Sequence, residues 1–145
     1  MKQRGFSLIE LLIVIGIIGL IATLAVPRIG RTLVRQSVRG ARDAVVGMHA
    51  KARAAAVQKG RATRLVFSGN TLLIRTQHPV TGVVDTVGAV EDLYSRFGVT
   101  LATSRDSLVF DARGIGTESS PTKITVSKGA YTDGIEINMW GRLVK

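Results

Sequence analysis

Residues 6–26 read FSLIELLIVIGIIGLIATLAV, an apolar run of 21 residues in which Glu10 is the one charged side chain. As an α-helix this run would be about 31 Å long, which matches the hydrocarbon thickness of a bilayer. The run is longer than the apolar part of a secretory signal peptide, which usually has about 7–15 residues followed by a cleavage site. The sequence therefore predicts a retained membrane-spanning helix over residues 6–26.

Glu10 is unusual inside this apolar run. Placing a carboxylate in hydrocarbon is costly unless a counter-charge accompanies it, so such residues usually mark a functional site. The alternative is that Glu10 lies near the membrane surface and stays hydrated. The residues alone leave both interpretations open.

A short basic leader, MKQRG at residues 1–5, precedes the run. Gly5 stands directly before Phe6, and Glu10 follows four residues later. This arrangement resembles the class III signal of type IV pilins and type II secretion pseudopilins. The resemblance implies that a prepilin peptidase cuts between Gly5 and Phe6 and methylates the new amine of Phe6. It also implies that Glu10 pairs with the N-terminal ammonium group of a neighbouring subunit.

The positive charges around the run conflict with the topology that this resemblance implies. Lys2 and Arg4 precede the run, whereas five arginines follow it within residues 28–42. Positive residues normally collect on the cytoplasmic side, so counting charges alone would place the N-terminus outside. The resemblance implies the opposite topology and rests on the more specific signal. We therefore expect a single-pass inner-membrane protein with its C-terminal domain in the periplasm or outside the cell.

A second helical pattern follows Pro27 and extends to about Lys59, with Gly60 as a stop signal. Proline removes one helical hydrogen bond, so we expect Pro27 to kink or interrupt the helix without ending it. Basic residues share one face: Arg28, Arg31, Arg35, Arg39, Arg42, His49 and Arg53. The opposite face is apolar: Leu33, Val34, Ala41, Ala44, Val45, Met48, Ala52 and Ala55. The pattern predicts an amphipathic helix over residues 27–60 whose alanine face packs on a sheet.

The apolar residues adopt a period of two from Ala62 onward. Segments 62–67 and 71–76 flank a Ser-Gly-Asn turn and are typical of a β-hairpin. Further strands are predicted at 82–87, 98–102, 107–111, 123–127 and 135–139, with a last edge strand at 142–145. Residues 89–97 fit a helical turn or a strand, and Asp133–Gly134 reads as a turn. The sequence predicts an α+β chain, a long N-terminal helix followed by an antiparallel β domain over residues 61–145.

Three later segments resemble the GspH/FimT family of pseudopilins and minor pilins. They are ARAAAVQKGRATRLVF at 52–67, LVFDARG at 108–114 and IEINMWGRLVK at 135–145. The resemblance implies a pilin-like fold and a minor subunit of a type II secretion or type IV pilus filament, supporting protein secretion or pilus biogenesis. The implied partners are other pilins or pseudopilins, the prepilin peptidase and an inner-membrane assembly platform.

The excess positive charge belongs to the second helical segment. The chain has 20 Lys+Arg against 10 Asp+Glu, a formal net charge of +10. Ten of the basic residues lie in residues 28–64 with Asp43 as the one acid, whereas residues 65–145 have eight of each sign. Three interpretations stay open for the arginines at 28, 31, 35, 39 and 42. They form a hydrated or lipid-headgroup-facing surface, contact acidic faces of neighbouring subunits, or bind nucleic-acid phosphates.

Residues 141–145, GRLVK, bear on the nucleic-acid interpretation. Some FimT-type minor pilins bind DNA during uptake through a C-terminal Gly-Arg-x-Arg element, a resemblance that implies a DNA contact for Arg142. Valine occupies the second arginine position and Lys145 follows one place later. Trp140 beside them would stack on a base. In the favoured interpretation Trp140 and Leu143 instead pack under the sheet and Arg142 is hydrated.

No pattern in the chain indicates an enzyme. The absence of cysteine excludes disulfides, thiolate metal sites and a cysteine nucleophile. Nucleophile-elbow, zinc-protease and phosphate-loop motifs are also absent from the sequence. We expect His49 on the surface, His78 in a turn, and Asp106 and Asp111 as turn residues rather than a carboxylate pair. The sequence therefore predicts no catalytic residue, no metal and no cofactor.

Overall fold

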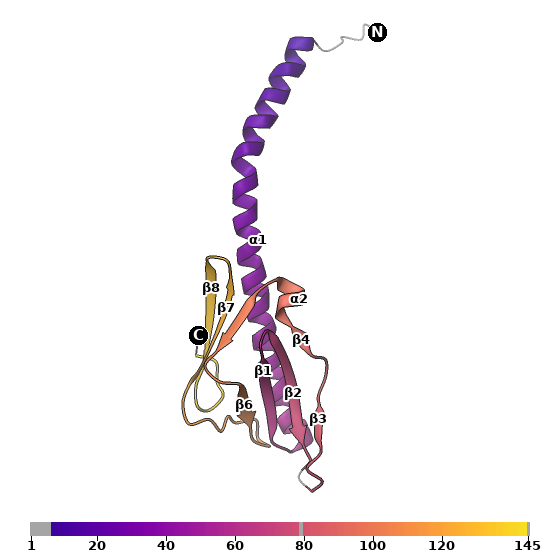
Figure 1. Cartoon of the computed structure of the whole chain (residues 1–145), viewed down its shortest axis with the longest axis vertical. Helices are drawn as coiled ribbons and strands as arrows, with labels where there is room; N and C mark the ends of the chain where they lie inside the picture. The colour runs from indigo at the N-terminus through magenta and orange to yellow at the C-terminus, as the bar shows by residue number, and fades with distance from the viewer. Residues whose placement is uncertain (1–6, 79, 145) are drawn as a thin grey trace. The chain divides into compact units, whose positions relative to one another are not determined.

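The computed structural model describes residues 7–78 and 80–144, without the side chains of residues 24–28. The chain divides into two compact units, Met1–Arg35 and Gln36–Lys145. Helix α1, Leu8–Lys59, begins in the first unit and ends in the second (Figure 1).

The part of helix α1 in the first unit carries the apolar run. The helix begins where the backbone N–H groups of Glu10 and Leu11 donate to the carbonyl oxygen of Ser7 at 3.1 and 3.2 Å. The helix is continuous through Pro27, so the proline does not end it, as the sequence indicated. The large apolar side chains between Leu8 and Ile21 are exposed.

No helix within the described part of the chain is both long and apolar enough to cross a membrane. The expected span over residues 6–26 includes Phe6 and the side chains of residues 24–26, which lie outside the described residues. The span stays a prediction.

In the second unit helix α1 is amphipathic. The buried residues follow helical spacing along one face: Val38, Ala41, Val45, Met48, Ala52, Ala55 and Ala56. Most of the predicted alanine face is buried, whereas Val34 and Ala44 are half-buried and Leu33 is exposed. The helix ends at Lys59 because Gly60 takes a left-handed φ of +59° and the N–H of Arg61 donates to the carbonyl oxygen of Ala56.

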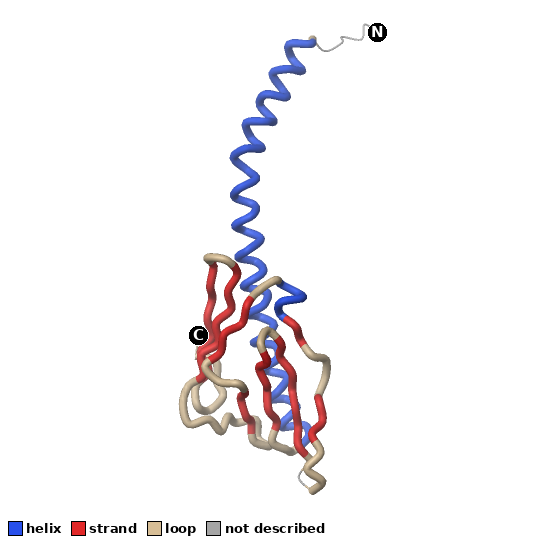
Figure 2. Tube along the Cα trace, in the orientation of Figure 1, coloured by secondary structure: helices blue, strands red, loops and turns tan. Residues whose placement is uncertain are grey.

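A five-stranded antiparallel sheet contains the predicted hairpin. Its strands are β1 (Thr63–Ser68), β2 (Thr71–Gln77), β3 (Val84–Thr86), β4 (Glu91–Asp92) and β6 (Ser107–Phe110). The order is β3-β2-β1-β6, and β4 also pairs with β2. In Figure 2 the C-terminal part of helix α1 lies behind β1 and β2.

The remaining strands form a separate three-stranded sheet in the order β5-β7-β8. Its strands are β5 (Thr100–Thr103), β7 (Thr122–Lys128) and β8 (Tyr131–Ile137). The short helix α2, Leu93–Phe97, connects β4 to β5 in the chain, and its N-terminus is capped by the Asp92 side chain. The ambiguous segment 89–97 therefore contains both a short strand and a helical turn.

Two local predictions are wrong. Asp133 and Gly134 lie inside β8, because the turn that precedes this strand uses Gly129, with φ +59°. The predicted edge strand at 142–145 is, among the described residues, a single bridge between Ile137 and Leu143. In the first case the pairing of β8 with β7 outweighs the turn preference of the Asp-Gly dipeptide.

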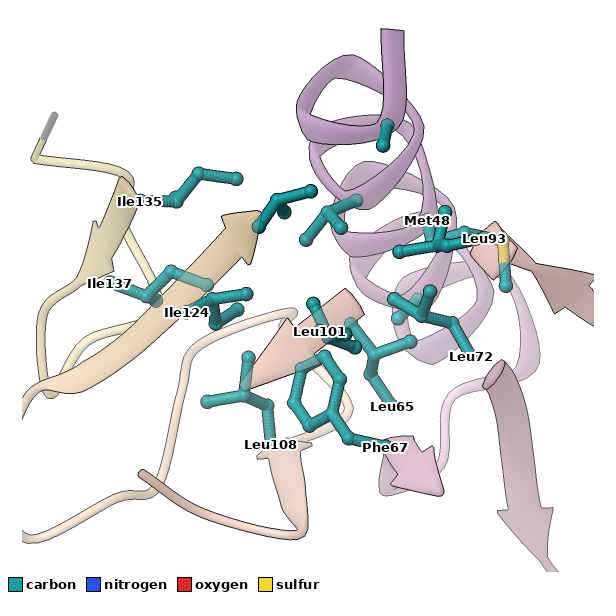
Figure 3. Packing of buried hydrophobic residues seen from close by; sticks show 14 of the residues in the cluster. Met48, Leu65, Phe67, Leu72, Leu93, Leu101, Leu108, Ile124, Ile135 and Ile137 are labelled. Atoms are coloured by element: carbon teal, nitrogen blue, oxygen red, sulfur yellow. The ribbon is translucent and has the colours of Figure 1, made fainter. Parts of the chain in front are cut away.

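Both sheets and helix α1 share one hydrophobic core. In Figure 3, Leu65, Leu72 and Leu108 of the first sheet point toward the same interior as Ile124 and Ile137 of the second. The α+β prediction, a long N-terminal helix with an antiparallel β domain, is confirmed.

Candidate functional site

The predicted processing and assembly residues lie at the start of the chain. Gly5 and Phe6 fall outside the described residues, so the structure says nothing of the predicted cleavage bond. Glu10 occupies the first turn of helix α1, and its side chain is exposed.

A tight turn at residues 138–142 positions Trp140 and Arg142, which form the C-terminal surface. The Asn138 Oδ1 atom accepts hydrogen bonds from the backbone N–H groups of Trp140, at 3.1 Å, and Arg142, at 2.8 Å. The N–H of Gly141 donates to the carbonyl oxygen of Asn138 at 2.9 Å. Gly141 has a φ of +74°, which glycine adopts without the steric cost of a Cβ atom.

His49 attaches helix α1 to this turn. Its Nε2 atom lies 3.0 Å from the carbonyl oxygen of Gly141, and its ring meets the Phe110 ring edge-on, with centroids 5.3 Å apart. Burial lowers the pKa of His49 below its ordinary value, the hydrogen bond to Gly141 opposes this, and the nearby Arg53 charge adds to the lowering. The prediction of a surface His49 is wrong, because the C-terminal turn covers the helix at that point.

A groove of about 620 Å³ lies between helix α1 and the loops beside it. The helix contributes apolar side chains, Val46, Ala50, Ala54 and Val57 among them. Arg53, Arg113 and Arg142 contribute positive charge. The Arg53 Nε atom is held by the carbonyl oxygen of Gly114 at 2.9 Å. The groove is therefore an apolar trough with a cationic lining.

Asp111 shapes the loop on one side of the groove. Its carboxylate accepts hydrogen bonds from the backbone N–H groups of Arg113 and Ile115 and from the Arg113 side chain. These bonds, the one from Ile115 above all, lower the pKa of Asp111. The prediction of Asp111 as a turn residue is confirmed.

Trp140 does not pack under the sheet, contrary to the favoured expectation. Its side chain is 63% exposed, and Leu143 is 40% exposed. The space beneath the turn is already filled, because a Cβ atom at Gly141 would lie 2.8 Å from Phe110 Cε1. Arg142 is exposed, as expected, and Lys145 lies outside the described residues.

The predicted basic stripe has side chains in different surroundings. Arg31, Arg35 and Arg39 are exposed, and the side chain of Arg28 lies outside the described residues. Arg42 is half-buried, with its Nε atom 3.8 Å from Asp133 Oδ2. Part of the stripe therefore serves packing within the domain rather than a free surface.

The described residues contain no group of three or more His, Cys, Asp or Glu side chains that could hold a metal ion. Sequence reasoning overlooked Asn138, the residue that orients Trp140 and Arg142. An Asn followed three residues later by glycine is typical of a side-chain-capped turn, and that signal would have indicated it.

Residues 1–26 match the prokaryotic N-terminal methylation motif. A search of curated protein sequences gives no match. Among solved structures, the chain is similar to the type IV minor pilin FimU of Pseudomonas aeruginosa in a crystal of space group P21. The TM-score is 0.61 at 18% identity, covering 75% of this chain and 87% of FimU. The fold is pilin-like.

A second FimU crystal form, in space group P65, agrees with this pilin-like assignment. Its TM-score is 0.57 at 19% identity, covering 72% of this chain and 89% of FimU. The methylation motif overlaps the first part of helix α1, which begins at Leu8, inside the matched residues.

Proposed function

We propose that this pilin-like chain is a minor subunit of a type II secretion pseudopilus or a type IV pilus. The observation that carries the proposal is the methylation motif at residues 1–26, followed in the same chain by a helix and domain of the pilin fold. In this role the chain is structural, with no catalytic residue and no cofactor.

The proposed mechanism begins with removal of residues 1–5 by a prepilin peptidase and methylation of Phe6. The helix from Phe6 onward holds the subunit in the inner membrane and packs with other pilins or pseudopilins as the assembly platform extracts it. Glu10 is the one carboxylate in the apolar run. Its attraction to the ammonium group of a neighbouring Phe6 compensates a charge that would otherwise be costly in that environment. Arg31 and Arg39 then lie where they meet lipid headgroups or acidic subunit faces.

Processing tests this proposal directly. The full chain is produced in a cell with an active prepilin peptidase, and the membrane-extracted protein is examined by mass spectrometry. The expected N-terminus is N-methylated Phe6, and Gly5→Leu should leave the leader attached. An intact Met1 terminus in the wild-type protein would contradict the proposal.

A second candidate function is DNA binding during natural transformation. The observation that favours it is that Arg142 lines the groove together with Arg53 and Arg113, two residues after the exposed Trp140. An exposed aromatic ring beside cationic side chains is suited to base stacking and phosphate contact. The secretion or pilus role remains the first candidate, since it uses both the N-terminal motif and the fold.

A further inference from the structure

The outer face of the five-stranded sheet carries two arginines directly opposite each other. The antiparallel register of β1 and β2 places Arg64 across from Arg75. Val109 of β6 and Thr86 of β3 continue the same row across the sheet. Side chains directly opposite in an antiparallel pair have Cβ atoms about 5 Å apart. The two guanidinium groups therefore extend from adjacent positions, and both side chains are exposed.

This pairing is unfavourable for folding by itself. Like charges directly opposite in a sheet destabilise it. Within the described ranges 7–78 and 80–144, no carboxylate lies within ion-pair distance of Arg64 or Arg75. The core does not need either side chain, because the buried residues of β1 and β2 point to the opposite face, toward helix α1. The arginine pair is thus a cost to the sheet that packing does not explain.

A depression of about 320 Å³ lies beside the arginine pair. Arg64 and Arg75 line it together with Val66, Val84 and Val109. A guanidinium group matches a carboxylate because its planar fork donates two parallel hydrogen bonds. The valines provide an apolar surface within the same depression. The lining is therefore complementary to a ligand that carries a carboxylate next to an apolar group.

We infer that this face binds an acidic, partly apolar polypeptide segment of a partner protein. A Glu or Asp carboxylate of the segment lies between Arg64 and Arg75, and a neighbouring apolar side chain contacts the valines. Asp106 also lines the depression and repels any anion, so the carboxylate of the segment lies on the side of the two arginines. A nucleic acid is a poorer match, since its phosphate backbone offers no apolar side chain to the three valines of the depression. None of the residues that line the depression belongs to the C-terminal turn at 138–142.

The test uses the full chain in zwitterionic detergent and a fluorescent peptide with the sequence Val-Glu-Val-Glu-Val. Binding is followed by fluorescence anisotropy at physiological salt. The double variant Arg64→Gln with Arg75→Gln should weaken binding about tenfold or more, as expected for losing charge-assisted hydrogen bonds. Lys51→Gln with Lys123→Gln removes the same amount of charge from other exposed positions and should change binding less than about twofold.

Two further measurements separate recognition from misfolding and from unspecific attraction. Without peptide, the arginine double variant should unfold at the same temperature as the wild type or higher, because the repulsion is relieved. A peptide with glutamine in place of glutamate should not bind. The inference is overturned if the lysine variant loses as much affinity, if the arginine variant is less stable, or if the acidic peptide does not bind. Competition by duplex DNA that depends on both arginines would also overturn it, in favour of a nucleic-acid site.

Discussion

The Nε2 atom of His49 and the carbonyl oxygen of Gly141 lie 3.0 Å apart, although 92 residues separate them in the sequence. His49 is buried on helix α1, and Gly141 belongs to the turn that displays Trp140 and Arg142. The contact makes the C-terminal surface depend on the packing of the helix.

The buried His49 predicts a loss of stability on acidification. Burial lowers its pKa in the folded protein, so below the ordinary value of 6.5 the unfolded chain binds more protons than the folded chain. The free energy of folding that neutral His49 contributes is fully present above pH 6.5. It is lost as the pH falls from 6.5 toward the folded-state pKa of His49. Thermal unfolding followed by circular dichroism between about pH 7.5 and pH 5 checks this.

Two variants assign that pH dependence. His49→Gln should flatten the dependence of the unfolding midpoint on pH, because no titrating group remains at the buried position. His78→Gln removes the other histidine, whose Nδ1 atom accepts hydrogen bonds from the backbone N–H groups of Val80 and Thr81, and measures its separate share of the pH dependence. If the unfolding midpoint of His49→Gln changed with pH as steeply as that of the wild type, His49 would be excluded as the cause of the pH dependence.

Gly141→Ala should destabilise the domain more than an alanine at another glycine of the same backbone conformation. A Cβ atom at residue 141 would lie 2.8 Å from Phe110 Cε1, in addition to the cost of a left-handed φ. Gly129→Ala is the matched control, with φ +59° and nothing within 4 Å of the added atom. We expect about 1–2 kcal/mol for the control and about 1–3 kcal/mol more for Gly141→Ala, measured by denaturant unfolding.

Glu10→Ala should leave the protein in the membrane but reduce its incorporation into filaments. The substitution removes a charge from an apolar helix, so insertion becomes easier, while the ammonium group of a neighbouring Phe6 loses its counter-charge. Fractionation and quantification in sheared filaments measure the two effects. Thr23→Ala is a control in the same helix, since the Thr23 hydroxyl donates to the carbonyl oxygen of Leu20. Normal incorporation of Glu10→Ala would argue against the pairing role.

Binding to duplex DNA should be weak, unspecific and absent near physiological ionic strength. A strongly basic helix attracts any polyanion, and affinity falls by about 0.9 log units per phosphate contact for each log unit of salt. Arg142→Ala with Lys145→Ala tests the tail, and Arg31→Ala with Arg39→Ala tests the helix. Sub-micromolar binding at physiological salt that only the tail variant abolishes would favour the DNA-uptake function instead.

The elements with short-range causes were predictable from the sequence. The apolar run, the alternation of apolar faces, the glycine stop at Gly60 and the Ser-Gly-Asn turn of the hairpin all act between residues close in the chain. Their outcomes are helix α1, its buried alanine face and the β1–β2 pair. The turn predicted at Asp133–Gly134 failed because pairing with β7 overrides a local turn preference.

The sequence by itself determined an N-terminal signal, a helix and an antiparallel domain, because periodicity and motif spacing are properties of neighbouring residues. Only the tertiary structure decided that His49 is buried under a turn 92 residues away. It also decided that Trp140 is exposed and that β6 brings Val109 beside Arg64. Such relationships depend on strand register and on which side chains already occupy the interior. Both are set by contacts between distant segments, so no local pattern encodes them.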